Sequence, residues 1–104
     1  MSDQAQDRTE AGRAKATVHV DNDRTRVTEY RFAPGDATGW HRHEYDYVIT
    51  PVTDGRLRLI GPDGAESYAD LVAGRSYFRA AGVEHDVINA GPAEVRFVEV
   101  EWKG

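Results

Sequence analysis

The chain has 104 residues and contains no cysteine. This absence excludes disulfide bonds and thiolate metal ligands, so nitrogen or oxygen atoms must hold any bound metal ion. It is also typical of a reducing compartment, and we therefore expect a cytoplasmic protein. The length is sufficient for one domain but not for two.

Long apolar runs are also missing, and no segment has the length and apolarity that a membrane-spanning helix requires. Residues 1–15 contain no valine, isoleucine, leucine or aromatic residue. They therefore offer neither the apolar stretch of a secretory signal nor surface that a core could bury. We predict a flexible N-terminal tail over residues 1–15 and one folded domain over residues 16–104.

Positive charge is scarce and dispersed along the chain. The 18 acidic residues outnumber the 13 lysine and arginine residues, which gives a formal net charge of −5. Because nucleic-acid binding requires a concentrated basic surface, we expect no nucleic-acid partner. We expect no membrane partner either, and the candidate ligand is a small molecule.

Short segments of β-branched and aromatic residues, bounded by turn residues, make up most of the chain. Their length and regular spacing are typical of strands, and no segment has a convincing helical period. The predicted strands cover residues 17–20, 24–32, 40–52, 56–60, 66–69, 76–79, 86–89 and 95–102. The predicted fold class is therefore all-β, a small antiparallel barrel or sandwich.

Two histidine-bearing segments, far apart in the chain, carry the strongest functional signal. Side chains alternate across a strand, so His41 and His43 share one face with Tyr45 and Tyr47. The opposite face carries charged side chains, which belong in water: Arg42, Glu44 and Asp46. The alternation predicts an inner face of histidine and aromatic residues.

A third histidine, His85, lies in the second segment between Glu84 and Asp86. If these acidic neighbours point outward, His85 points inward by the same alternation. A bare pair of histidines on a strand is more often two surface residues, but a third imidazole on another strand favours a shared metal ion. His19 is isolated in an early strand, and we expect it at the surface.

The pattern of these residues resembles the cupin superfamily, whose motifs are G-x5-H-x-H-x3,4-E-x6-G and G-x5-P-x-G-x2-H-x3-N. The first motif is matched by Gly35, His41, His43 and Gly55. The second is matched by Gly74, Gly82, His85 and Asn89, with Ala80 at the proline position. The resemblance covers residues 24–102 and implies a small single-domain cupin with the jelly-roll, or double-stranded β-helix, fold.

The sequence departs from the family pattern at one metal ligand. Tyr47 or Val48, depending on the spacing, stands where the family has a glutamate. Three histidines without the carboxylate are similar to the site of the thiol dioxygenases in this superfamily. The resemblance therefore implies His41, His43 and His85 as the ligands of one divalent transition-metal ion.

Three neutral imidazoles leave the charge of a divalent ion uncompensated, so such a site is expected to prefer an anionic ligand. Nitrogen ligands suit Fe, Ni, Zn, Mn or Cu and do not select among them. Our leading hypothesis is a metal-dependent enzyme of the oxygenase type that acts on a small anionic metabolite. A non-redox isomerase or lyase, and a non-catalytic binding or sensing module, are the alternatives.

Four further residues have candidate roles at or near this site, and a fifth, Asn89, has an expected structural role. Tyr47 is either a catalytic phenol near the metal or a core aromatic residue, since it shares the face of the ligands. Trp40 and Tyr45 are expected to line the substrate pocket or to pack at the end of the barrel. Arg79 is a candidate partner for a substrate carboxylate. Asn89 is expected to hydrogen-bond a turn.

An assembly is also expected. Val48 and Val52 lie on the outer side of the predicted long strand, where a monomer would leave them exposed. A second sheet or a second subunit could cover them. The resemblance to small cupins implies a homodimer that pairs through its sheets and N-terminal strands.

Overall fold

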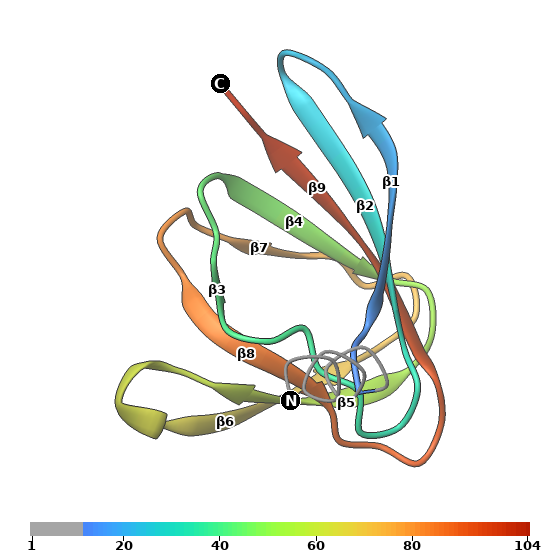
Figure 1. Ribbon diagram of the computed structural model, residues 1–104. Coiled ribbons are helices and arrows are strands. Elements are labelled where there is room, and N and C mark those ends of the chain that lie inside the picture. Colours follow the sequence, from blue (N-terminus) through green and yellow to red (C-terminus); the bar gives the residue numbers. More distant parts are fainter. Residues whose placement is uncertain (1–11) are drawn as a thin grey trace, which may run out of the picture.

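Two antiparallel sheets face each other in the computed structural model, which describes residues 12–104 (Figure 1). The five-stranded sheet has the order β1 (Lys15–Asp21), β2 (Thr25–Phe32), β9 (Val95–Trp102), β4 (Asp46–Pro51) and β7 (Tyr77–Arg79). The four-stranded sheet has the order β3 (His41–Arg42), β8 (Glu84–Asn89), β5 (Gly55–Ile60) and β6 (Glu66–Leu71). A single 3-10 turn, η1 (Pro62–Gly64), connects β5 to β6. The predicted all-β class is confirmed.

The predicted strand over residues 40–52 is wrong in one respect, because the structure divides it into β3 and β4. β3 pairs with β8 in one sheet, whereas β4 pairs with β9 and β7 in the other. The chain therefore crosses between the sheets at residues 43–45. Strand propensity could not reveal the break, because every side chain in this stretch suits an extended backbone.

The interior of the fold is apolar at one end and polar at the other. Along β9, the inward positions begin with buried Val95 and Phe97 and continue with buried Glu99 and Glu101. β2 runs antiparallel beside β9, and its side chains also change from apolar to polar towards the same end of the interior. From the apolar to the polar end, the cross-strand pairs are Phe32–Val95, Tyr30–Phe97, Thr28–Glu99 and Arg26–Glu101. Burial at the apolar end stabilises the fold, whereas the polar end is available for chemistry.

Most of the hydrophobic core lies at the apolar end, and Tyr47 and Ile49 extend it along β4 beside Glu101 and Glu99. Burial of each large side chain of this core contributes about 1.5–3 kcal/mol to the free energy of unfolding. The buried core residues are Phe32, Tyr47, Ile49, Leu57, Leu71, Val87, Val95 and Phe97.

Two residues of the family motifs close this end of the barrel. Gly55 lies so near Val95 that a Cβ atom would come within 2.5 Å of the Val95 Cγ2, which explains the need for glycine. Asn89 is 2% exposed. Its amide donates hydrogen bonds to the carbonyl oxygens of Phe32 (3.2 Å) and Ala93 (2.8 Å) and accepts one from the Gly91 N–H (2.9 Å). Asn89 therefore ties a turn to the core, in the structural role expected of it.

The ordered fold begins slightly earlier than the predicted residue 16. Ala14 donates a backbone hydrogen bond to Ala37 (3.0 Å), and the Ala37 N–H donates one to Gly12 (2.9 Å). Backbone pairing, which needs no large side chain, places residues 12–15 against the domain. The rest of the predicted tail, residues 1–11, lies outside the described residues. Within residues 12–104, no helix is long and apolar enough to cross a membrane.

Candidate metal centre

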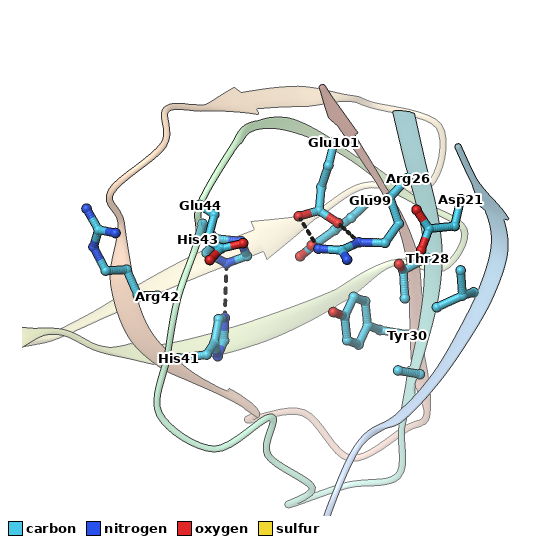
Figure 2. Close-up of a pocket in the computed structure, with 12 residues that line it drawn as sticks. Asp21, Arg26, Thr28, Tyr30, His41, Arg42, His43, Glu44, Glu99 and Glu101 are labelled. Carbon is cyan, nitrogen blue, oxygen red and sulfur yellow. Dashed lines mark hydrogen bonds and ion pairs between the residues drawn. The ribbon is translucent and has the colours of Figure 1, made fainter. Parts of the chain in front are cut away.

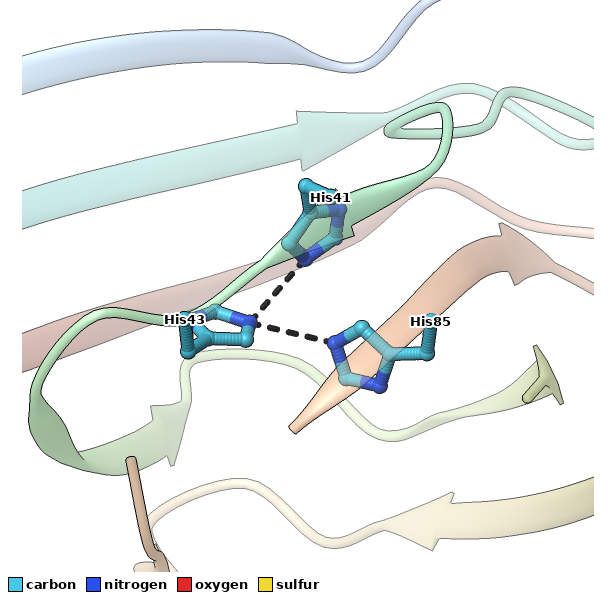
Figure 3. Close-up of side chains that lie close together, drawn as sticks. All are labelled: His41, His43 and His85. Atoms are coloured by element: carbon cyan, nitrogen blue, oxygen red, sulfur yellow. Dashed lines mark hydrogen bonds between the residues drawn. The ribbon is translucent and has the colours of Figure 1, made fainter. Parts of the chain in front are cut away.

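Three imidazole rings converge at the polar end of the interior (Figure 3). His41 on β3 and His85 on β8 are direct partners across the strand pair, and His43 follows β3 on the same face. The Nε2 atoms of His41 and His43 are 3.0 Å apart, and those of His43 and His85 are 3.1 Å apart. The convergence predicted for these three residues is thus present in the structure.

The orientation of His41 is set by the chain just before it. His41 Nδ1 lies 2.9 Å from the carbonyl oxygen of Gly39, which can only accept a hydrogen bond. Nδ1 therefore carries the proton, and the lone pair on Nε2 faces the other two rings. The Thr38 hydroxyl, 3.2 Å from the same Nδ1, also donates to the Gly39 carbonyl and accepts from the Val87 N–H.

His43 is held by backbone hydrogen bonds and by stacking. Its N–H donates to the Val83 carbonyl (2.9 Å), and the Gly82 N–H donates to its carbonyl (2.8 Å). Gly82 adopts a φ of 97°, in the left-handed region that favours glycine. The His43 ring stacks on Tyr47 with ring centroids 4.0 Å apart and planes 18° apart. These contacts leave the His43 imidazole little freedom to turn away.

Burial keeps two of the rings neutral. It lowers the pKa of His43 to about 4, with a smaller contribution from neighbouring His41. It also lowers the pKa of His85 to about 3, with further contributions from the other two histidines and Arg79. Neutral imidazole is the form that binds a metal ion.

The arrangement fits a metal ion. Metal–nitrogen bonds of about 2.0–2.1 Å with bond angles of about 90–109° place ligand nitrogens about 2.9–3.4 Å apart, and the two short separations between the rings lie in this range. Within residues 12–104, His41, His43 and His85 are the only group of at least three histidine or acidic side chains close enough to share an ion. No carboxylate joins them, as expected from Tyr47 at the glutamate position.

A cavity of about 400 Å³ opens beside the histidines and extends to β2 and β9 (Figure 2). His41 and His43 lie on one side of it, opposite Arg26, Tyr30 and two glutamates of β9. The Arg26 guanidinium binds both carboxylate oxygens of Glu101, through Nε at 2.8 Å and Nη2 at 3.3 Å. This bidentate pair neutralises one of the two buried carboxylates.

The second buried carboxylate, Glu99, was not found from the sequence. Glu99 is 7% exposed, and burial together with the charge of Glu101 raises its pKa to about 8. Its position has a sequence signal in retrospect, because Val95 and Phe97 set the inward parity of β9. At Glu99, the inward face of β9 changes from the apolar side chains of the core to the polar side chains that line the cavity.

The remaining predicted site residues lie outside the group of three histidines, and they differ in burial and in the cavities that they line. Tyr47 is 1% exposed and packs in the core against His43, and it is not among the residues lining the large cavity. Arg79 lines a second cavity, of about 270 Å³, together with His85. Trp40 is 54% exposed and Tyr45 is half-buried, and neither lines these two cavities. His19 is at the surface, 2.8 Å from Glu29.

Comparison with known proteins gives consistent results. Residues 28–101 match the family described as the cupin domain. The β-alanine degradation protein BauB of Pseudomonas aeruginosa is 59% identical over 95 residues, which cover 89% of this chain and 99% of that protein. A cupin domain from Bordetella pertussis has a crystal structure with a TM-score of 0.84 at 51% identity, covering 88% of this chain and 95% of that one. The structure of the polyketide cyclase RemF from Streptomyces resistomycificus has a TM-score of 0.65 at 25% identity. The match covers 88% of this chain and 68% of RemF.

Glu99 makes the stability of the metal-free protein dependent on pH. Its folded-state pKa of about 8 lies above the ordinary value of 4.5, so near neutral pH the folded protein holds a proton that the unfolded chain has released. The resulting stabilisation is full below the unfolded-state pKa and is lost as the pH rises through about 8. The lowered pKa values of His43 and His85 affect stability only below about pH 6.5.

Between about pH 7 and about pH 9, we therefore expect the metal-free protein to lose about 1 kcal/mol of unfolding free energy. Glu99→Gln should remove this loss, because the amide does not titrate. Glu94→Gln, at a side chain 47% exposed, should retain it. Urea unfolding of the three proteins at both pH values measures the effect, and an equal loss in Glu99→Gln would contradict the assignment.

Proposed function

We infer the function from one premise: this chain belongs to the cupin family. We propose that His41, His43 and His85 hold one divalent transition-metal ion, and that the protein is a metal-dependent enzyme acting on a small anionic metabolite. The observation that carries the proposal is the approach of three imidazoles, two of them from directly paired strands, to a common point. Fe, Ni, Zn, Mn and Cu all suit these ligands.

A bound ion of this kind supplies Lewis acidity, and a redox-active metal also supplies oxygen chemistry. The chain's own residues bind and orient the substrate. Because imidazole binds a metal ion as a neutral ligand, the ion would keep its full charge and would attract an anionic group. Arg79 borders the second cavity with His85, and we propose it as a partner for a substrate carboxylate. Tyr47 fixes the plane of His43 by stacking on it, which makes it a positioning residue in this account.

The relative BauB narrows the proposed substrate class. The name of BauB describes that protein as one of β-alanine degradation. Its similarity to this chain extends over 89% of this chain and 99% of BauB, at 59% identity. We extend this role to the present chain as a proposal, with an oxygenase-type reaction on a small carboxylic acid. A cavity of about 400 Å³ suits a ligand of that size.

Removal of one ligand should abolish metal binding. In protein purified without a histidine tag, we expect elemental analysis to find about one transition-metal ion per chain. His41→Ala and His85→Ala should each lose it, because two imidazoles bind such an ion much more weakly than three. The control is His19→Ala, which removes a surface histidine outside the group. Metal content unaffected by His41→Ala and His85→Ala would refute the proposed centre.

A non-redox reaction is the second candidate, and one observation favours it. RemF, which has the same fold at 25% identity, is named as a polyketide cyclase. An enzyme of this type would use the ion as a Lewis acid only.

Oxygen consumption distinguishes the candidates. Protein loaded with Fe(II) should consume oxygen when it turns over a small carboxylic acid substrate if it is an oxygenase. Zn(II)-loaded protein should then be inactive, since Zn(II) has no redox chemistry. Turnover with Zn(II) and without oxygen uptake would establish the isomerase or lyase alternative. Tight metabolite binding without turnover under any metal would favour a binding module.

A homodimer is proposed from the outer face of the five-stranded sheet. An apolar row crosses all five strands in register, from Val20 through Val27, Val100 and Val48 to Phe78. Phe78 is 59% exposed and Val20 is 42% exposed. A second copy could bury this row, which the isolated chain leaves partly in water.

Light scattering should accordingly give about twice the chain mass of 11.6 kDa. Phe78→Ser should shift the population towards the monomer, because it removes the largest exposed side chain of the row. Tyr68→Ser is the matched control, since Tyr68 is 52% exposed but lies on β6 in the other sheet. A wild-type monomer at micromolar concentration would contradict the proposal.

A further inference from the structure

One buried carboxyl group in the large cavity, that of Glu99, has no hydrogen-bond or ion-pair partner among residues 12–104. Glu99 is 7% exposed, yet no hydrogen bond to its carboxyl forms within residues 12–104. No buried side-chain oxygen or nitrogen in this part of the chain is both fully enclosed and unpaired. The Glu99 oxygens therefore reach the surface of the cavity, where a ligand could contact them.

The nearby cation, Arg26, makes no hydrogen bond to Glu99 within residues 12–104, although its charge acts to lower the pKa of Glu99. Arg26 uses both Nε and Nη2 to bind Glu101, and both residues line the same cavity as Glu99. The other basic residue lining the cavity, Arg42, is exposed, and its guanidinium lies 4.0 Å from Glu84. Four carboxyl and two guanidinium groups line the cavity in all, so acidic side chains outnumber the arginines there.

The placement of Glu99 relative to the histidines gives it a distinct role. Glu99 and His41 both line the large cavity and also a third cavity, of about 270 Å³, which Thr38 and Val87 border as well. Glu99 is nevertheless outside the group that could share a metal ion. Figure 2 shows Glu99 on the wall opposite His41 and His43, beside the Tyr30 ring. With the ion bound, the cavity would have a cationic pole at the histidines and, opposite it, a buried carboxyl group at Glu99 that a cation could draw into its ionised form.

We propose that Glu99 binds the ammonium group of a small amino acid whose carboxylate lies at the three-histidine centre. This inference rests on the proposed metal centre, and it deepens the proposed function by naming the ligand class as an amino-carboxylic acid. The ammonium group would restore to Glu99 the hydrogen bond and opposite charge that the protein does not provide. The Tyr30 ring offers an aromatic wall beside the same group.

The test compares two probes that differ only in the amino group. Calorimetry with Zn(II)-loaded protein near neutral pH would measure the binding of β-alanine and of propionate. We expect wild type to bind β-alanine at least about tenfold more tightly, as a buried charge-assisted hydrogen bond provides. Glu99→Gln should bring the two affinities together by weakening β-alanine binding, with propionate binding and zinc content unchanged. Glu94→Gln should retain the wild-type preference.

The two proposals fail in different ways. Equal affinities in wild type, an unchanged preference in Glu99→Gln, or no β-alanine binding at any soluble concentration would overturn the role of Glu99. A preference for 3-hydroxypropionate over β-alanine would also overturn it, because Glu99 would then recognise a neutral hydroxyl group. By contrast, wild type that takes up no zinc, or that binds propionate equally well with and without zinc, would refute the metal centre and, with it, the placement of the ligand carboxylate at the three histidines.

Discussion

The direct pairing of His41 with His85 across β3 and β8 is the constraint on which the site depends. It brings together imidazoles that are far apart in the chain, and the backbone bonds between His43 and the Gly82–Val83 turn fix the third ring beside them. The pairing is possible because the chain crosses from one sheet to the other directly after β3. A continuous strand in the β4 sheet would have carried the first two histidines away from the third.

The same architecture separates stability from chemistry. Residues that share one face of β9 begin in the core with Val95 and end in the site with Glu99 and Glu101, so one strand serves both functions. Burial has opposite effects on the two kinds of titratable group here. It favours neutral histidines, which are ready to bind an ion, and it disfavours an ionised Glu99 until a cation arrives. A metal ion would therefore bind where the imidazoles are held neutral, and a cationic ligand group would supply the opposite charge that an ionised Glu99 lacks.

Much of the fold and the centre of the site could be predicted from the sequence, because both depend on local patterns. Strand alternation correctly placed His43 and Tyr47 on an inner face, and motif spacing linked them to His85. The break before β4 depends on which sheet each half joins, and no local pattern encodes that choice. Glu99 was missed for a related reason. A glutamate in an alternating strand is ordinarily a solvent-facing residue, and the parity set by Val95 and Phe97 becomes decisive only when the structure shows that Glu99 is buried.

The most direct test of the metal centre is an anomalous difference map from crystals grown with a single transition metal, recorded on both sides of its absorption edge. The account predicts one strong peak inside the barrel, within about 2.0–2.1 Å of the Nε2 atoms of His41, His43 and His85. A peak bound only elsewhere, or none at this point in metal-saturated crystals whose three rings still converge, would contradict it.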